Sequence, residues 1–220
     1  IYRKITVRLL PFLIICYLFA YVDRTNIGFA KLQMQQEMPS LTEAVFGLGS
    51  GIFFLAYACL EIPSNLLMNK IGARRTITRI MVLWGLTSTA MLFVHSTASF
   101  YLIRVLLGIF EAGFAPGIVL FFTYWFPAYR MGRVMGLFAI AGPIGSVFGS
   151  ATSGLIIGLM HNVAGLSGWQ WMFLLQGIPA LILGILFWFL IPDNPLKASW
   201  LTDSQKKIVA DKLAITRQQH

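Results

Sequence analysis

The sequence predicts an all-α membrane protein in which six transmembrane helices form one bundle. Of its 220 residues, 57% are hydrophobic and only 11% are charged, whereas charged residues make up about 25% of a soluble domain. Apolar runs of about 20 residues, the length that crosses the hydrocarbon core of a bilayer, recur along the whole chain. The basic residues gather in alternate connections between these runs, which is the pattern of a multi-pass membrane protein.

The first three spans are expected in the first half of the chain. The first, at about residues 9–30, is the run LLPFLIICYLFAYV, which continues through a pair of charges into IGFA. The second, at about residues 45–68, opens on GLGSG; no strand precedes these glycines, so they do not indicate a nucleotide-binding loop. The third, at about residues 77–94, contains Trp84, which is expected to pack or to lie at the membrane interface.

The next three spans follow at similar spacing. The fourth is expected at about residues 100–125 and the fifth at about residues 134–159. In the fifth, GPIGSVFGSATSG places small residues three to four apart, which predicts close helix packing with a bend at Pro143. The sixth, at about residues 171–191, ends before two prolines, which cannot continue a helix.

The chain changes character after the sixth span. Residues 1–192 are expected to form the bundle, and residues 193–220 a cytoplasmic linker toward a C-terminal bundle that this sequence does not include. Thr202 and Gln205 have the spacing of a capping box, and the mixed apolar and lysine residues after them predict a short amphipathic helix. This helix is expected either to lie along the inner membrane surface or to be a solvated linker.

The distribution of basic residues predicts the orientation of the spans. Most of the 17 lysines and arginines lie before the first span, between spans two and three, between spans four and five, and after the sixth. The opposite connections hold only Lys31. By the positive-inside rule both ends of the chain are cytoplasmic, and we expect the protein in the inner (plasma) membrane. The net charge of +9 is therefore mainly a topology signal, and no nucleic-acid partner is expected.

Residues that commonly hold metals or carry catalysis are sparse. Cys16 and Cys59 lie inside apolar runs, where cysteine behaves as a small apolar residue. The three histidines are far apart along the chain. The sequence shows neither a metal-ligand spacing nor a pairing of nucleophile and base. We therefore expect no metal, no cofactor and no enzymatic activity.

Four charged residues lie deep inside the first and fourth predicted spans. Asp23 and Arg24 fall about 14 residues into the first span, roughly 20 Å from its cytoplasmic end. Arg104 and Glu111, seven residues apart, share one face of the fourth span at a comparable depth. A charge at such a depth costs about 2.5–3.5 kcal/mol, so each needs a partner or a water-filled cavity. The side chains of Asp23 and Arg24 point about 100° apart and cannot neutralise each other on one face.

These charges predict a cavity that binds an organic anion and exchanges protons. Burial and a nearby arginine act in opposite directions on the affinity of a carboxylate for a proton, so Asp23 and Glu111 are predicted to carry protons. The planar guanidinium of arginine matches a carboxylate, so Arg24 and Arg104 are predicted to bind the substrate or to tune the two acids. The expected partners are thus a small organic acid, protons and the lipid bilayer.

Other polar residues of the spans are less specific. Tyr57 and Asn26 can each donate a hydrogen bond to a substrate, whereas Glu61 is assigned no role. The alternative to a transport site is a set of salt bridges that only holds the helices together, although an apolar residue would pack there at less cost.

Several stretches also carry a family resemblance. They cover nearly the whole chain and read DRTNIGFA, EIPSNLLMNKIGARR, RVLLGIFEAGFAPG, YWFPAYRMGRVMGLF, GWQWMFLLQGIPA and PDNPLKASWLT. On these stretches the chain resembles the N-terminal half of a major facilitator superfamily transporter. More narrowly, it resembles the anion:cation symporter family of tartrate, phthalate, 4-hydroxyphenylacetate and sugar-acid permeases.

The resemblance implies one bundle of a major facilitator fold, in which two six-helix bundles surround a central cavity and work by alternating access. It implies proton-coupled import of an organic anion, with proton linkage at Asp23 and Glu111. It also implies that Arg24 and Arg104 serve the substrate or the coupling pair, and that Tyr57 contributes to the pocket.

The connection between spans two and three departs from the superfamily motif, G-x-x-x-D-R/K-x-G-R/K-R/K. Asn65 stands at the glycine and Asn69 at the aspartate. Lys70, Gly72 and a basic cluster, Arg74 and Arg75, remain in this connection. The resemblance implies that this is a gating loop. Because an asparagine cannot supply the anion of a salt bridge, neutral hydrogen bonding would replace it at Asn69.

Two other functions stay open from the sequence. A non-transporting scaffold or truncated half-transporter would use the buried charges only to lock its helices. Proton-driven efflux of a cationic drug is weaker, because the two intramembrane arginines favour anions. The sequence beyond residue 220 would separate a complete transporter from a scaffold.

Overall fold

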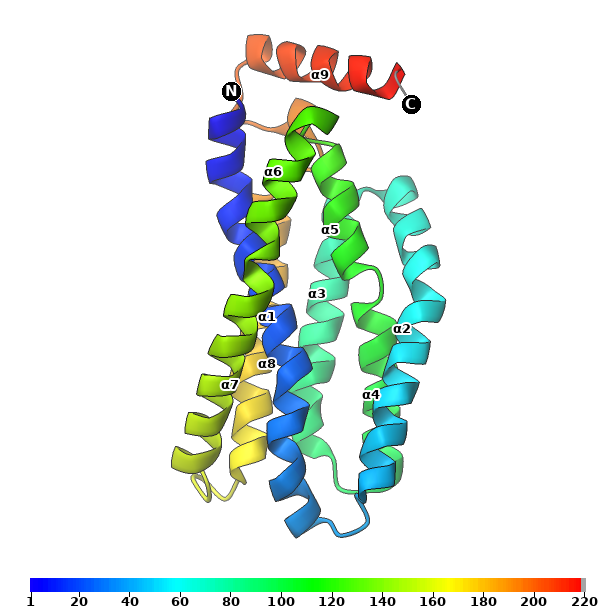
Figure 1. Cartoon of the computed structure of the whole chain (residues 1–220), viewed down its shortest axis with the longest axis vertical. Coiled ribbons are helices and arrows are strands. Elements are labelled where there is room, and N and C mark those ends of the chain that lie inside the picture. The colour runs from blue at the N-terminus through cyan, green and yellow to red at the C-terminus, as the bar shows by residue number, and fades with distance from the viewer. Residues whose placement is uncertain (219–220) are drawn as a thin grey trace.

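The computed structural model describes residues 1–218, and every regular element in that part of the chain is helical. It contains 6 helical spans that are long and apolar enough to cross a membrane, which confirms the predicted all-α membrane bundle. The spans run along the long axis of the molecule, and the N-terminus lies at the same end as the C-terminal helix (Figure 1). The final residues of the expected linker, 219–220, lie outside the described residues.

The first three spans are α1 (Tyr2–Glu37), α2 (Glu43–Ile71) and α3 (Ala73–Ala90), which the 3-10 turn η1 (Met91–Phe93) extends. The 36 residues of α1 cover about 54 Å at about 1.5 Å per residue, against about 30 Å for the hydrocarbon core. The helix is therefore longer than the predicted span and extends beyond that core. At the start of α2, the Thr42 side chain accepts a hydrogen bond from the Val45 N–H at 3.4 Å, as an N-cap residue does.

The fourth span is divided by a break that the sequence analysis did not predict. Its parts are α4 (Thr97–Glu111) and α5 (Phe114–Thr123). Gly113, between them, has a φ of +84° in the left-handed region, which glycine adopts at little cost. A Cβ at this position would also lie 2.7 Å from Ser64. The break comes directly after Glu111 and so turns the chain at the depth of the buried charges.

The fifth span is divided into α6 (Ala128–Ala139) and α7 (Ala141–Leu159). The interruption falls at Ile140, one turn before the expected bend at Pro143. Proline has no N–H to donate to the carbonyl four residues earlier. The helical hydrogen bond that Pro143 cannot make is therefore missing from the turn that precedes it.

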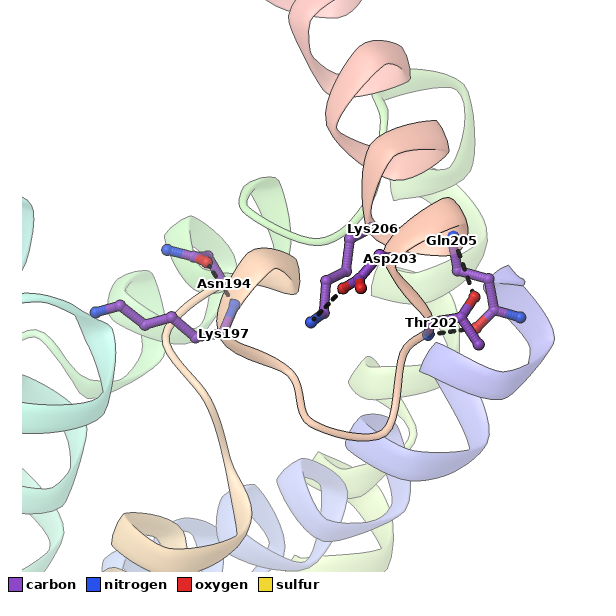
Figure 2. A network of polar contacts seen from close by, with 6 residues as sticks. All are labelled: Asn194, Lys197, Thr202, Asp203, Gln205 and Lys206. Atoms are coloured by element: carbon purple, nitrogen blue, oxygen red, sulfur yellow. Dashed lines mark hydrogen bonds and ion pairs between the residues drawn. The ribbon is translucent and has the colours of Figure 1, made fainter.

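The sixth span, α8 (Gly168–Leu190), is followed by the 3-10 turn η2 (Pro195–Lys197) and by α9 (Asp203–Gln218), which lies across the end of the bundle (Figure 1). The predicted capping box is present: the Thr202 N–H donates to Gln205 and the Gln205 N–H donates to Thr202 Oγ1, both at 3.3 Å. Figure 2 shows this cap beside the Asn194 cap of η2 and the ion pair of Lys206 with Asp203.

The linker packs against the bundle. Val209 of α9 is fully buried, and the Trp200 ring stacks on Trp125 with centroids 5.7 Å apart and planes 8° apart. The guanidinium of Arg8 lies 5.4 Å from the centre of the Trp200 ring. Aromatic stacking and burial thus fix the linker to α1 and to the end of α5.

The interior of the bundle is aromatic and closely packed. The fully buried side chains include Trp84, Trp125 and Trp169. α3 and α8 approach so closely that a Cβ at Gly85 would lie 2.5 Å from the Leu181 nitrogen. Large apolar side chains of α2 and α7, such as Phe54 and Val147, are exposed, as expected for helices that face lipid or another bundle.

Candidate functional site

Asp23 lies on α1, and α3 supplies most of its hydrogen bonds. The Trp84 indole Nε1 donates to Asp23 Oδ2 at 2.8 Å, and the Ser88 hydroxyl donates to Oδ1. Asn26, one turn along α1, donates to Oδ1 at 3.1 Å. Trp84 and Ser88 are four residues apart, so they share the face of α3 that meets α1. Neutral donors thus satisfy the charge of this carboxylate.

The sequence analysis missed two of these donors. Trp84 is fully buried, as the packing prediction expected, but its hydrogen bond to Asp23 was not predicted, and Ser88 was not considered. The signal was present: a buried indole N–H usually has a hydrogen-bond partner, and both residues lie on one face of a span. Asn26 was predicted to contact substrate; it is 1% exposed and donates to Asp23.

Arg24 forms an ion pair with Glu111 of α4. The guanidinium Nη2 and Nε lie 2.8 and 3.0 Å from Glu111 Oε1. Both contacts use the same oxygen, and Glu111 Oε2 is buried with no hydrogen-bond partner among the described residues. The Arg24 side chain is 31% exposed and that of Glu111 only 1%. The pair therefore has an accessible cation and an inaccessible anion.

Two tyrosines flank the accessible cation. The Arg24 guanidinium carbon lies 5.8 Å from the centre of the Tyr21 ring and 5.7 Å from that of Tyr57. Both distances are within the range of cation–π attraction. Tyr57, predicted to line the pocket, is thus beside the arginine; Tyr21 was not predicted.

Arg104 does not pair with Glu111, although both residues are on α4. Its Nε donates to the Gly49 carbonyl of α2 at 3.3 Å, and its guanidinium lies 4.7 Å from the centre of the Phe53 ring. The residue is 8% exposed. Asp23 and Glu111 nevertheless act on it electrostatically, so it belongs to the same charge cluster. We call Asp23, Arg24, Arg104 and Glu111 the charge cluster below.

Each adjacent charge on α1 has its own partner, as the 100° separation of neighbouring helical residues predicts. Asp23 bonds to α3 and Arg24 bonds to α4. A buried carboxylate, a partly exposed arginine and flanking aromatic rings can together bind a carboxylate ligand and exchange a proton.

The connection between α2 and α3, predicted to be a gating loop, is also held by hydrogen bonds. The Tyr124 hydroxyl donates to Asn69 Oδ1 at 2.9 Å, so Asn69 makes a neutral hydrogen bond. The Arg74 N–H at the start of α3 donates to Asp193 Oδ1 at 2.9 Å, and Lys197 pairs with Asp193 Oδ2 at 3.1 Å. Asp193, which was not predicted as a site residue, therefore brings a carboxylate to this loop from the segment after α8.

The remaining loop residues surround the same place. Gly72 has a φ of +92°, and a Cβ there would lie 2.8 Å from Asp193 Oδ1. Lys70 lines a cavity of about 780 Å³ together with Asn69, Gly72, Asp193 and residues of α9. Arg75 is exposed. The loop, the segment after α8 and the linker thus meet at one end of the bundle.

A helical bundle with six spans long and apolar enough to cross a membrane has the architecture of a multi-pass membrane protein. Ionisable residues in the interior of such a bundle commonly mark substrate or ion paths. Residues 13–218 match the model of the Major Facilitator Superfamily. The chain belongs to this family, which confirms the resemblance seen in the sequence and the expectation that the protein is not an enzyme.

Named transporters are among the relatives. A putative tartrate transporter of Agrobacterium vitis is 50% identical over 204 residues, which are 93% of this chain and 45% of the relative. The putative metabolite transport protein NicT of Pseudomonas putida is 50% identical over 97% of this chain and 49% of its own length. The chain thus spans about half the length of the curated relatives it matches.

A solved structure shares the fold. It is described as a bacterial homolog to the human lysosomal transporter Spinster in an inward-facing and occupied conformation. The match has a TM-score of 0.72 at 23% identity and covers 85% of this chain and 44% of that chain.

Proposed function

We propose that this chain is one six-helix half of a secondary transporter that imports a small organic carboxylate together with protons. The observation that carries the proposal is the pair of Arg24 and Glu111, in which a partly exposed arginine holds a fully buried carboxylate. The partial exposure gives a carboxylate ligand access to the guanidinium, and the burial makes Glu111 depend on that guanidinium.

Competition for Arg24 couples substrate to protons. A substrate carboxylate that binds Arg24 takes the guanidinium from Glu111. An uncompensated charge in a buried site costs about 3–5 kcal/mol, and a proton taken up by Glu111 removes that charge. Substrate binding therefore favours protonation of Glu111, and loss of the proton favours release of the substrate.

The other residues of the charge cluster have supporting roles in this proposal. Asp23 is the second proton-linked group, and Trp84, Ser88 and Asn26 hold it toward α3. Arg104 is a second cation for the substrate or for the two acids. Tyr57 presents its ring beside Arg24 and so contributes to the substrate pocket.

The whole transporter extends beyond these residues in the same proposal. Residues 1–192 form the N-terminal bundle, and residues 193–220 lead toward a C-terminal bundle that supplies the opposite wall of the cavity. The chain lies in the inner membrane with both ends of this segment cytoplasmic, as the positive-inside rule requires. The gating loop, with Asn69, Lys70, Gly72, Arg74 and Arg75, opens and closes the cytoplasmic side.

The names of the relatives support a carboxylate substrate. Tartrate, named for the Agrobacterium vitis relatives, carries two carboxylates that an arginine can bind through paired hydrogen bonds. A panel of organic acids therefore supplies the candidate substrates for uptake.

The experiment is uptake by the intact protein in proteoliposomes, with internal pH recorded. We expect Glu111→Gln and Asp23→Asn to abolish accumulation against a gradient, because neither amide can carry the proton. Counterflow exchange of substrate should continue, since it needs no net proton movement. Glu61→Gln is the matched control, because it removes a carboxylate of α2 outside the charge cluster, and it should transport normally. Accumulation by both cluster variants would contradict the proposal.

Drug efflux is the second candidate, because one relative is named a quinolone resistance transporter. That protein, from Acinetobacter baumannii, is 43% identical over 96% of this chain. In this alternative the protons enter as the drug leaves. A rise in quinolone resistance on expression, with no uptake of any organic acid, would support efflux in place of import.

A further inference from the structure

A second cavity, remote from the charge cluster, opens between the start of α1 and α6. Its volume is about 330 Å³. Three arginines line it: Arg3 of α1 and Arg130 and Arg133 of α6. None of them forms an ion pair with a described residue. Among the described residues that line the cavity there is no aspartate or glutamate, so its positive charge is uncompensated.

One of these arginines is positioned by aromatic rings. The Arg130 guanidinium lies 4.6 Å from the centre of the Tyr2 ring and 5.4 Å from that of Tyr129. Cation–π contacts of this kind restrict the position of a guanidinium and leave its N–H groups free to donate hydrogen bonds to a ligand. The cavity therefore has one cation positioned by aromatic rings, Arg130, and two further arginines.

Tyr2 adds a polar group with no partner. The residue is 7% exposed, and its hydroxyl oxygen is buried without a hydrogen-bond partner in the described part of the chain. A buried hydroxyl left unpaired is costly, and Tyr2 lines the cavity. An oxyanion bound there would accept a hydrogen bond from this hydroxyl and remove the cost.

The rim of the cavity is apolar. Val7 and Leu137 line it and are 66% and 40% exposed. Exposed apolar side chains beside a basic pocket match the boundary between acyl chains and headgroups, where the apolar and charged parts of a lipid meet. A free anion gains nothing from such a rim, whereas a lipid places its chains against it.

We propose that this cavity binds the phosphate headgroup of an anionic phospholipid. The three arginines and the Tyr2 hydroxyl hold the phosphate oxygens, because guanidinium groups match phosphate through paired hydrogen bonds, and Val7 and Leu137 contact the acyl chains. Through Arg130 and Tyr2 the lipid joins α6 to the first turn of α1. The proposal does not depend on the transported substrate.

The test is native mass spectrometry of the purified intact protein with phosphatidylglycerol, phosphatidylcholine or inorganic phosphate. Each basic residue near a membrane surface contributes about five-fold in affinity for anionic lipid. We expect Arg3→Gln/Arg133→Gln to weaken phosphatidylglycerol binding roughly twenty-five-fold, and Tyr2→Phe to weaken it several-fold. The matched control is Arg75→Gln/Lys207→Gln, which removes the same charge from exposed positions outside the cavity and should change binding less than two-fold.

Three outcomes would overturn the proposal. An equal loss in the control variant would show that the lipid follows the overall surface charge. Equal binding of phosphatidylcholine would remove the role of the arginines. Inorganic phosphate bound as tightly as phosphatidylglycerol would make the site one for a free anion. Since Arg3 is exposed, Arg3→Gln alone keeps the test available if the double variant does not fold, and should weaken binding about five-fold.

Discussion

Asp23 and Arg24 are neighbours in the chain, yet they connect α1 to different helices. Asp23 accepts its hydrogen bonds from Trp84 and Ser88 of α3, and Arg24 pairs with Glu111 of α4. A change in the charge of Asp23 therefore alters the contact of α1 with α3, whereas a change at Arg24 alters the contact of α1 with α4. Two adjacent positions on one helix thus control the contacts among three helices.

At this scale we predict that Arg24→Gln destabilises the fold, and that adding Glu111→Gln restores it. The single variant leaves the buried carboxylate without its cation, which should lower the free energy of unfolding by about 3–5 kcal/mol. The double variant replaces the ion pair with two neutral amides and should recover most of that loss. Thermal unfolding of the intact protein in detergent measures both effects.

The control is Arg75→Gln, which removes an exposed arginine and should leave the unfolding midpoint unchanged. Equal stability of Arg24→Gln and wild type would mean that the ion pair contributes nothing to the fold. Both variants should lack coupled transport, so stability and activity report separately on this pair.

The sequence predicted the depth of the charge cluster but not its pairing. Spacing placed Asp23, Arg24 and Glu111 at one level, because depth follows from counting residues along a helix. Which helix faces which is set by packing between segments far apart in the chain. Trp84, which donates to Asp23 across 61 positions, therefore looked like one more packing residue.

At the scale of elements, the break between α4 and α5 determines where Glu111 lies. Glu111 ends α4, and Gly113 with its left-handed φ redirects the chain into α5. The carboxylate is thus at a helix end, where the backbone is less regular than in an uninterrupted span. Ser64 of α2 also lies 2.7 Å from an ideal Cβ on Gly113, so a larger side chain has no room at the break.

We predict that Gly113→Ala destabilises the protein by at least about 1 kcal/mol, because alanine is strained at this φ and its Cβ meets Ser64. Gly117→Ala, one turn along, is the matched control. Its Cβ would lie 3.5 Å from the nearest atom, and alanine in a helix interior is better than glycine by about 0.5–1 kcal/mol. The two substitutions should shift the unfolding midpoint in opposite directions.

The six spans were predictable because apolar length is a local property of the sequence. The break at Gly113 was not predictable, because the sequence alone does not distinguish a glycine that packs inside a helix from a glycine that ends one. Only the surrounding structure, here the approach of α2 at Ser64, decides between these two uses. The same holds for Pro143, where the sequence indicated a bend and the structure interrupts the helix at Ile140, one turn earlier.

At the scale of the whole molecule, Asp193 connects the end of α8 to the start of α3. Its carboxylate accepts from the Arg74 N–H and pairs with Lys197, while Gly72 leaves the space that the carboxylate occupies. The start of α3 and the segment after α8 are thus joined at the end of the bundle where the linker packs. The sequence pointed to a missing acid in the loop, but not to its replacement more than a hundred residues away.

We predict that Asp193→Ala loosens this end of the bundle without unfolding it. The start of α3 loses a group that acts as its cap, which costs about 1 kcal/mol. Hydrogen–deuterium exchange should rise in the segment around Gly72 and in η2. Asp203→Ala, which removes an exposed acid paired with Lys206, is the control and should leave exchange around Gly72 unchanged. Unchanged exchange in Asp193→Ala would show that Asp193 does not hold the loop.

The parallel rings of Trp125 and Trp200, with centroids 5.7 Å apart, give the protein an internal optical reporter. The Trp125 ring is fully buried, so removal of Trp200 and its segment would expose Trp125 to solvent and shift its fluorescence emission. One ring belongs to the bundle and the other to the segment leading into α9. The tryptophan emission therefore reports whether the linker is docked on the bundle, without an added label.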